Sequence, residues 1–380
     1  MTENSLAPED ALVPSILADF SLPHLPPDIA LSGGWAAPEG EICWALGAYS
    51  EITIGPARWA HGQRTGRILA IIRATPYLGQ NLQARQRVGI SVNGTLAREV
   101  SLERAGLLAF WLPAEYSARP LIIGFDHPDA CSPADVGAGE DQRRFAFAFH
   151  ALQLWHIPEM PRDCMPPGIS GPVPGDILGR FESLGDNCEF GIAQRLAGNE
   201  PLALLRFAAA PLGALISGLL NEFADFGDAG FTEIDIRGDK REYILTEHRY
   251  NLTYHTFTYE DQMPEARVLS RESRKLELLS RRMLDDLRTA RRIYIVKQNT
   301  GLAEGDVYSL FLLLRRFGPN RLIHVALADA AHPAGTVEML LPGLLRGYIT
   351  RFAPYDAAAD VLLDEWLTLC HNAEAVLQTA

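Results

Sequence analysis

The chain has 380 residues, of which 47% are hydrophobic and 21% are charged, and its formal net charge is −13. Nucleic acid is excluded as the main partner, because phosphate binding needs a basic surface. The length and composition indicate a soluble globular protein of two or three domains.

The N-terminal residues 1–34 are proline-rich and weakly patterned, and we expect them to form a loose segment. They lack a basic stretch followed by an apolar core, so we expect no signal peptide. No apolar run approaches the roughly 20 residues of a membrane span. The five cysteines are widely spaced, which predicts neither a disulfide framework nor a metal site. We therefore expect a cytoplasmic protein without metal or cofactor.

Residues 35–157 show the period of two that is typical of strands. Ile52 and Ile54 alternate with polar neighbours, a second alternating run, 88–92, ends at the hairpin signal Asn93-Gly94, and phenylalanines alternate over 145–149. Together with short apolar runs, the pattern predicts about eight strands in an antiparallel β-sandwich of jelly-roll type.

Tryptophans on such a sandwich can stack on sugar rings when they are exposed. Trp35 and Trp44 are our first candidates for glycan binding, with Trp59 and Trp111 as further ones. We expect at least two of the four to fill the core instead.

A proline-rich stretch, 158–176, is the expected interdomain linker, because six prolines in the seventeen residues 158–174 cannot sustain a helix or a central strand. Residues 177–380 then mix both periods and predict an α/β or α+β domain. The expected helices are 188–196, 212–223, 264–290, one around 307–314, and 361–377. The expected strands are 231–237, 243–246, 252–257, 292–297 and 321–327.

A cysteine begins one of these helices, in Ser183-Leu-Gly-Asp-Asn-Cys188. Unpaired N–H groups and the helix dipole at that position favour a thiolate, so Cys188 is the candidate nucleophile. Asp186 or Asn187 is the expected helix cap, and the Asn187 side chain and the Cys188 N–H are candidate oxyanion donors. Asp186 and Glu189 would raise the pKa of the thiol unless they point away.

A catalytic cysteine also needs a base and a group that orients it. His255, among aromatic residues on an expected strand, is the first choice, and His248 is the second. Asn299 is a candidate orienting residue, and Asp261 and Asp329 stay open as alternatives.

The segment 181–191, continuing to 194–196 and 204–207, resembles the opening motif of a bacterial family of papain-like cysteine peptidases. The resemblance covers about residues 178–330 and implies a papain-like domain in which Cys188 pairs with His255. The family commonly has a Pro-Phe-Asp-Trp-like segment where this chain has Leu205-Arg-Phe-Ala208, which puts a shared substrate pocket in doubt.

The sandwich ending at Asp141–Phe147, together with Trp35 and Trp44, resembles modules attached to bacterial glycosyltransferases. That resemblance implies a glycan or glycan-assembly proteins as partners. An Asp-x-Asp motif of glycosyltransferases is absent, and Glu233-Ile-Asp235 is the nearest approach.

Two hypotheses follow from the sequence. The first is a cysteine hydrolase or acyltransferase acting on an amide or ester, linked to glycan or surface-polysaccharide metabolism. The alternative is a non-catalytic glycan-binding or scaffold protein in polysaccharide assembly.

Overall fold

A computed structural model describes residues 14, 16–22, 25–55, 66–113, 120–160, 164–165 and 173–379. The chain divides into two compact units, Met1–Glu159 and Met160–Ala380, and each is described by itself. The division falls at the start of the expected linker 158–176, most of which lies outside the described residues.

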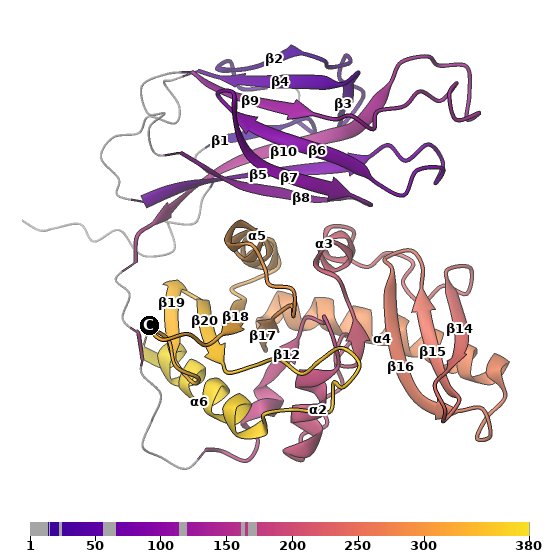
Figure 1. Ribbon diagram of the computed structural model, residues 1–380, viewed down its shortest axis with the longest axis vertical. Coiled ribbons are helices and arrows are strands. Elements are labelled where there is room, and N and C mark those ends of the chain that lie inside the picture. Colours follow the sequence, from indigo (N-terminus) through magenta and orange to yellow (C-terminus); the bar gives the residue numbers. More distant parts are fainter. Residues whose placement is uncertain are drawn as a thin grey trace, which may run out of the picture. The chain divides into compact units, whose positions relative to one another are not determined.

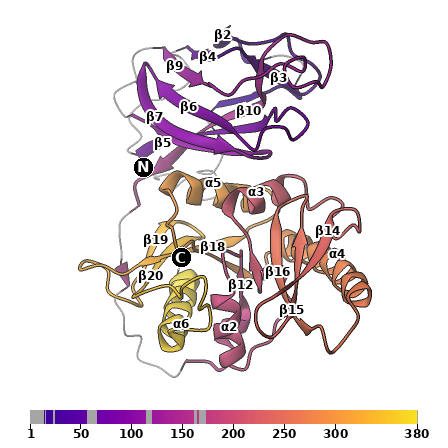
Figure 2. The same cartoon turned by 45° about the vertical axis from the view of Figure 1, so that its right-hand side comes forward.

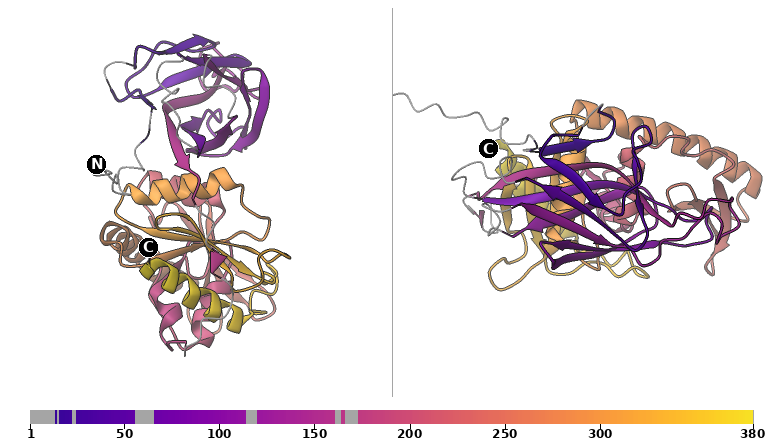
Figure 3. Two further views of the ribbon diagram at one scale, coloured as in Figure 1. Left: turned by 90° about the vertical axis from the view of Figure 1, so that its left-hand side faces the viewer. Right: turned by 90° about the horizontal axis from the view of Figure 1, so that it is seen from above.

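The first unit is an antiparallel β-sandwich, as predicted (Figures 1 and 3). One sheet has the order β1-β10-β5-β8, with β3 also paired to β10, and the other has the order β2-β4-β9-β6-β7. Their bounds are β1 Ile16–Asp19, β2 Ile29–Gly33, β3 Cys43–Leu46, β4 Tyr49–Ile54, β5 Gly66–Pro76, β6 Gln86–Val92, β7 Thr95–Leu102, β8 Gly106–Leu112, β9 Leu121–Asp126 and β10 Phe145–Pro158.

The sandwich core lies between these sheets and uses the residues whose alternation predicted the strands. Ile52, Ile90 and Phe147 are fully buried in one cluster with partners from both sheets. Asn93 and Gly94 both have positive φ and close the β6–β7 hairpin, which confirms the turn expected there.

The expectation of a loose segment over residues 1–34 is wrong for its second half. Strand β1 pairs with β10, and strand β2 pairs with β4. Ala18 and Ile29 are buried in the sandwich core, so these short strands gain apolar contacts that a weak local pattern does not reveal.

The second unit is built on a six-stranded sheet of order β11-β19-β20-β18-β17-β12. Strands β12, β17, β18 and β20 are parallel neighbours, and β19 is antiparallel to β20. The bounds are β11 Cys164–Met165, β12 Phe181–Ser183, β17 Ile293–Val296, β18 Arg321–Leu327, β19 Val337–Leu341 and β20 Leu344–Ile349. The sequence missed β11, β12, β19 and β20, although Pro342-Gly343 marks the turn between the last two.

Helices cover both faces of this sheet (Figures 1 and 2). Helices α2 and α6 contact each other, as do α3 and α5. The helices are η3 Ile177–Arg180, α2 Glu189–Leu196, α3 Leu212–Leu220, α4 Glu265–Thr289, α5 Glu304–Arg315 and α6 Leu363–Thr379. The α/β prediction is thus confirmed, whereas this sheet order does not establish the papain-like domain that the resemblance implies.

A smaller antiparallel sheet of order β13-β16-β15-β14 belongs to the same unit, and α4 packs against its strands β14 and β15. Its strands are β13 Ala208–Ala209, β14 Thr232–Arg237, β15 Glu242–Glu247 and β16 Leu252–Tyr259. Over the described ranges, no helix is both long and apolar enough to cross a membrane.

Candidate functional site

The turn that carries Cys188 follows β12 at the carboxyl end of a parallel strand, the edge where open α/β sheets place their ligand sites. Gly185 and Asp186 have φ values of +97° and +82°. A Cβ on Gly185 would lie 2.4 Å from the Cβ of Ala210, so only glycine fits this turn.

The Cys188 thiol is buried, with 8% of the residue exposed. Burial, and secondarily the Glu242 carboxylate, raise its pKa to about 11, while Arg195 acts in the opposite direction. The resting group is therefore a protonated thiol at neutral pH. This corrects the expectation of a thiolate at the helix N-terminus, because burial disfavours the charged form of the thiol.

Asp186 and Glu189, the acidic neighbours of Cys188 in the sequence, form hydrogen bonds and ion pairs with other residues. Asp186 accepts a hydrogen bond from the Tyr355 hydroxyl at 2.9 Å and lies 3.4 Å from Nζ of Lys297. Glu189 lies 2.8 Å from the same Nζ and accepts a hydrogen bond from the Trp366 indole at 3.1 Å. Lys297 is only 3% exposed, so it neutralises two carboxylates beneath the turn.

Asn187 and Asn299, the two candidate site asparagines, form hydrogen bonds within the buried cluster around Lys297. Asn187 Oδ1 accepts the backbone N–H of Glu189 at 3.1 Å, and its amide donates to Ala353 O at 3.4 Å. Asn299 accepts a hydrogen bond from Lys297 at 2.7 Å and donates one to Ala353 O at 2.7 Å. Asn187 thus stabilises the start of α2, and Asn299 holds Lys297 rather than a histidine.

The residue that holds His255 is Glu242, which the sequence analysis missed. Oε2 of Glu242 lies 3.1 Å from Nδ1 of His255, and Oε1 accepts the backbone N–H of Phe257 at 2.9 Å. Strands β15 and β16 are antiparallel neighbours in which Ile244 pairs with His255. The pairing is irregular between Glu242 and Ile244, and Glu242 lies just before the expected strand 243–246, so the predicted strands did not place it beside His255.

The other orienting candidates do not serve His255. Asp329 lies 3.0 Å from Nδ1 of His332, and Asp261 is exposed after β16. His248, the second candidate base, pairs through Nε2 with Glu233 at 2.9 Å, and this pair is exposed.

Cys188, Glu242 and His255 are brought to one region of the second unit. The Glu242 carboxylate that binds His255 also acts electrostatically on Cys188. A Cβ on Gly191, one turn into α2, would lie 3.0 Å from the Phe207 ring, and Phe207 O accepts the backbone N–H of His255. Within the described residues the Cys188 sulfur has no hydrogen bond to a histidine ring.

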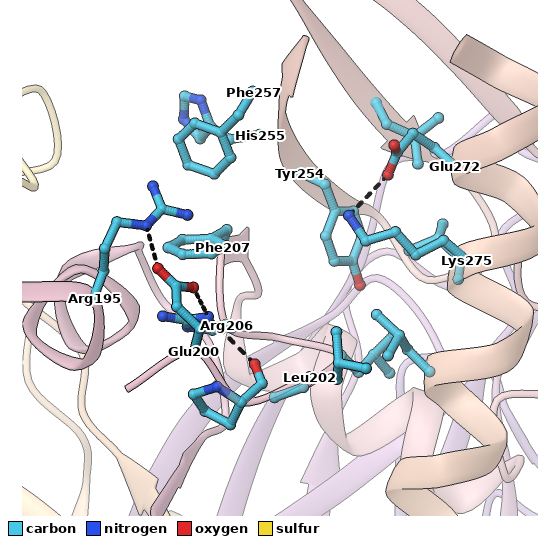
Figure 4. Close-up of a pocket in the computed structure, with 16 residues that line it drawn as sticks. Arg195, Glu200, Leu202, Arg206, Phe207, Tyr254, His255, Phe257, Glu272 and Lys275 are labelled. Carbon is cyan, nitrogen blue, oxygen red and sulfur yellow. Dashed lines mark hydrogen bonds and ion pairs between the residues drawn. The ribbon is translucent and has the colours of Figure 1, made fainter. Parts of the chain in front are cut away.

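A cavity of about 320 Å³ lies beside His255 (Figure 4). His255 and Phe257 stand at one end of it, and Arg195 stacks on the rings of Phe207 and Phe257 at 4.6 and 4.8 Å. The His255 side chain is 49% exposed, so a substrate can reach its ring.

The tryptophans of the first unit mostly have packing roles. Trp35 packs against the sandwich core, and its indole donates to Glu51 O at 2.8 Å. Trp44 is half-buried, with Phe145 at 5.2 Å and Tyr77 at 6.1 Å between ring centroids. Trp111 is half-buried under the Arg67 guanidinium, and Trp59 lies outside the described residues.

Among the residues that the structure describes, no group of three or more His, Cys, Asp or Glu is placed to hold a metal ion. No known family model matches the sequence, and no curated protein matches it either.

The chain is distantly similar to several solved structures. The xylan-binding domain CBM22-1 of Xyn10C from Paenibacillus barcinonensis has 10% identity and a TM-score of 0.27, over 39% of this chain and 97% of that chain. A family 35 carbohydrate-binding module from Clostridium thermocellum has 11% identity and a TM-score of 0.24, over 37% and 97%. The acetyl xylan esterase Est2A from Butyrivibrio proteoclasticus has 10% identity and a TM-score of 0.24, over 94% and 98%. At such low scores these likenesses assign no activity or ligand to either unit.

Proposed function

We propose that the second unit is a cysteine-dependent hydrolase or acyltransferase that acts on an amide or ester. The observation that supports this most is that one carboxylate, Glu242, both binds Nδ1 of His255 and acts on the Cys188 thiol. A histidine whose Nδ1 donates to a carboxylate presents Nε2 as a base, which is the histidine–carboxylate half of a nucleophile triad.

Because the Cys188 thiol rests protonated, the proposed reaction begins with a proton transfer. Nε2 of His255 takes the thiol proton while the sulfur attacks the carbonyl carbon, giving a tetrahedral oxyanion. The carbon then expels the amine or alcohol, which takes the proton from His255, and a thioester remains on Cys188. Water or another nucleophile attacks this thioester, with His255 accepting its proton, and the thiol is regenerated.

The thioester step is testable with p-nitrophenyl acetate, an activated ester with a small acyl group. We expect an acetyl adduct on Cys188 in the mass spectrum of the intact protein and its peptides. His255→Ala should slow formation of the adduct by about 100-fold or more, since it removes the general base.

His248→Ala is the matched control, because His248 is also exposed and also paired with a glutamate. It should leave the rate unchanged. An acetyl group on Cys43 or Cys370 in preference to Cys188, or equal rates in the two histidine variants, would contradict the proposal.

The second candidate function is non-catalytic binding of a glycan by the first unit, for which Trp44 and Trp111, both half-buried, are the aromatic candidates among the described residues. Burial of Cys188, which disfavours the thiolate, is the observation that keeps this alternative open. An intact protein that forms no Cys188 adduct with p-nitrophenyl acetate would leave it as the better account of the chain.

A further inference from the structure

The cavity beside His255 has a mostly apolar lining, formed mainly by three segments of the second unit, with Arg195 of α2 and Leu245 of β15 added. The loop after α2 supplies one wall, β16 supplies the second, and α4 supplies the third (Figure 4). Its buried aliphatic lining residues are Leu204, Leu245, Leu276 and Leu279. A cavity of this size and lining suits a small ligand with an apolar body.

One polar group of this lining has no partner. Tyr254 is 7% exposed, and its hydroxyl makes no hydrogen bond within the described residues. Figure 4 shows the hydroxyl directed into the space between α4 and the loop that carries Leu202. A buried hydroxyl without a partner is unfavourable, and a ligand that exchanges a hydrogen bond with it removes that cost.

The charged groups at the cavity are already paired. Glu200 binds both Arg195, at 2.9 Å, and Arg206, and Glu272 lies 3.0 Å from Nζ of Lys275. A charged ligand would have to compete with these carboxylates or cations. The lining therefore suits a neutral ligand better than an anion or a cation.

We propose that this cavity binds a neutral group with a ring-sized apolar body and one hydroxyl or carbonyl that hydrogen-bonds to Tyr254. This inference rests on the proposed function in one respect, namely that the bound group belongs to the substrate whose carbonyl Cys188 attacks. Tyr254 then determines specificity, and His255 at the end of the cavity lies next to the reacting part of the substrate.

The test uses p-cresol and toluene, which share an aromatic body and a methyl group and differ in one hydroxyl. Binding to the full-length Cys188→Ala protein is measured by ligand-observed NMR, so that no acyl transfer is needed. We expect p-cresol to bind about three- to tenfold more tightly than toluene, as one neutral hydrogen bond allows. Tyr254→Phe should abolish the preference.

Tyr294→Phe is the matched control. The Tyr294 hydroxyl is also buried and unpartnered within the described residues, but Tyr294 does not line this cavity. The Tyr294→Phe protein should keep the preference for p-cresol. Equal binding of the two probes, no binding of either, or a preference that survives Tyr254→Phe would overturn the proposal.

These outcomes are separable from those of the acetylation experiment. A preference that depends on Tyr254 in a protein that forms no Cys188 adduct would leave the ligand site standing and remove the acyl-transfer proposal. Acetylation of Cys188 without a Tyr254-dependent preference would support the acyl-transfer proposal and remove the ligand site.

Discussion

At the scale of single residues, the ionisation of Cys188 is decided by its surroundings and not by its place in the sequence. The start of a helix favours a thiolate, yet burial raises the pKa to about 11. Asp186 and Glu189, the nearest acids along the chain, are held by Lys297, and the acid that acts on the thiol is the distant Glu242.

The opposing effects of Glu242 and Arg195 on Cys188 lead to a paired prediction. Glu242→Gln removes a negative charge and should lower the pKa of Cys188, whereas Arg195→Gln removes a positive charge and should raise it. In both variants the pKa should stay above the ordinary 9.0, because burial is the largest cause. The pH dependence of iodoacetamide alkylation at Cys188 measures it, and shifts of the same sign in both variants would refute the assignment.

At the scale of elements, the site depends on how closely α2 approaches the loop 204–207. Gly191 makes this approach possible, because a Cβ there would lie 2.3 Å from the carbonyl oxygen of Arg206. The sequence predicted α2 from its apolar period, but nothing in that period shows which backbone segment the helix contacts.

Gly191→Ala should therefore destabilise the protein by about 2 kcal/mol, through displacement of α2 from the loop. Gly213→Ala is the matched control, because Gly213 lies in α3 with no atom within 4 Å of the added Cβ. It should leave stability unchanged or raise it by up to about 1 kcal/mol, because alanine favours a helix over glycine. Urea unfolding of both variants measures the difference, and equal stabilities would show that α2 tolerates the added methyl group.

At the scale of the whole molecule, each unit has its own buried apolar cluster. The sandwich cluster uses residues between Ala18 and Leu154, and a cluster of the second unit uses residues between Ile177 and Val376. The second unit also buries a carboxyl group in the sheet, since Glu182 on β12 is 3% exposed. Burial and the nearby Asp286 raise its pKa to about 7.

This carboxyl group makes the stability of the second unit depend on pH. The native pKa of about 7 lies above the ordinary 4.5, so the native state binds more protons over that interval. The free energy of unfolding should therefore fall as pH rises from about 4.5 to 7, by about 3 kcal/mol in total.

Glu182→Gln should remove this dependence, being more stable than the natural protein at pH 8 and similar to it at pH 4.5. Hydrogen exchange of the β17 amides at increasing urea concentration measures the free energy of unfolding of the second unit. Glu277→Gln, at an exposed position, is the control. If the natural protein were as stable at pH 8 as at pH 4.5, the predicted cost of ionising the buried Glu182 would be refuted.

The sequence by itself determined the elements that depend on neighbours along the chain. The alternation at 88–92 and the Asn93-Gly94 turn predicted a hairpin, and the apolar stripe of 264–290 predicted a long helix, because side-chain periodicity reflects local geometry. It also placed Cys188 beside the start of a helix.

Only the tertiary structure decided which groups meet. The contacts of Glu242 with His255, and of Lys297 with Asp186 and Glu189, depend on strand order and register, which bring together residues far apart in sequence. The state of the Cys188 thiol and the unpartnered Tyr254 hydroxyl depend on burial, a property of the packed molecule. Local periodicity carries no information about either, because desolvation is set by all the atoms that surround a group.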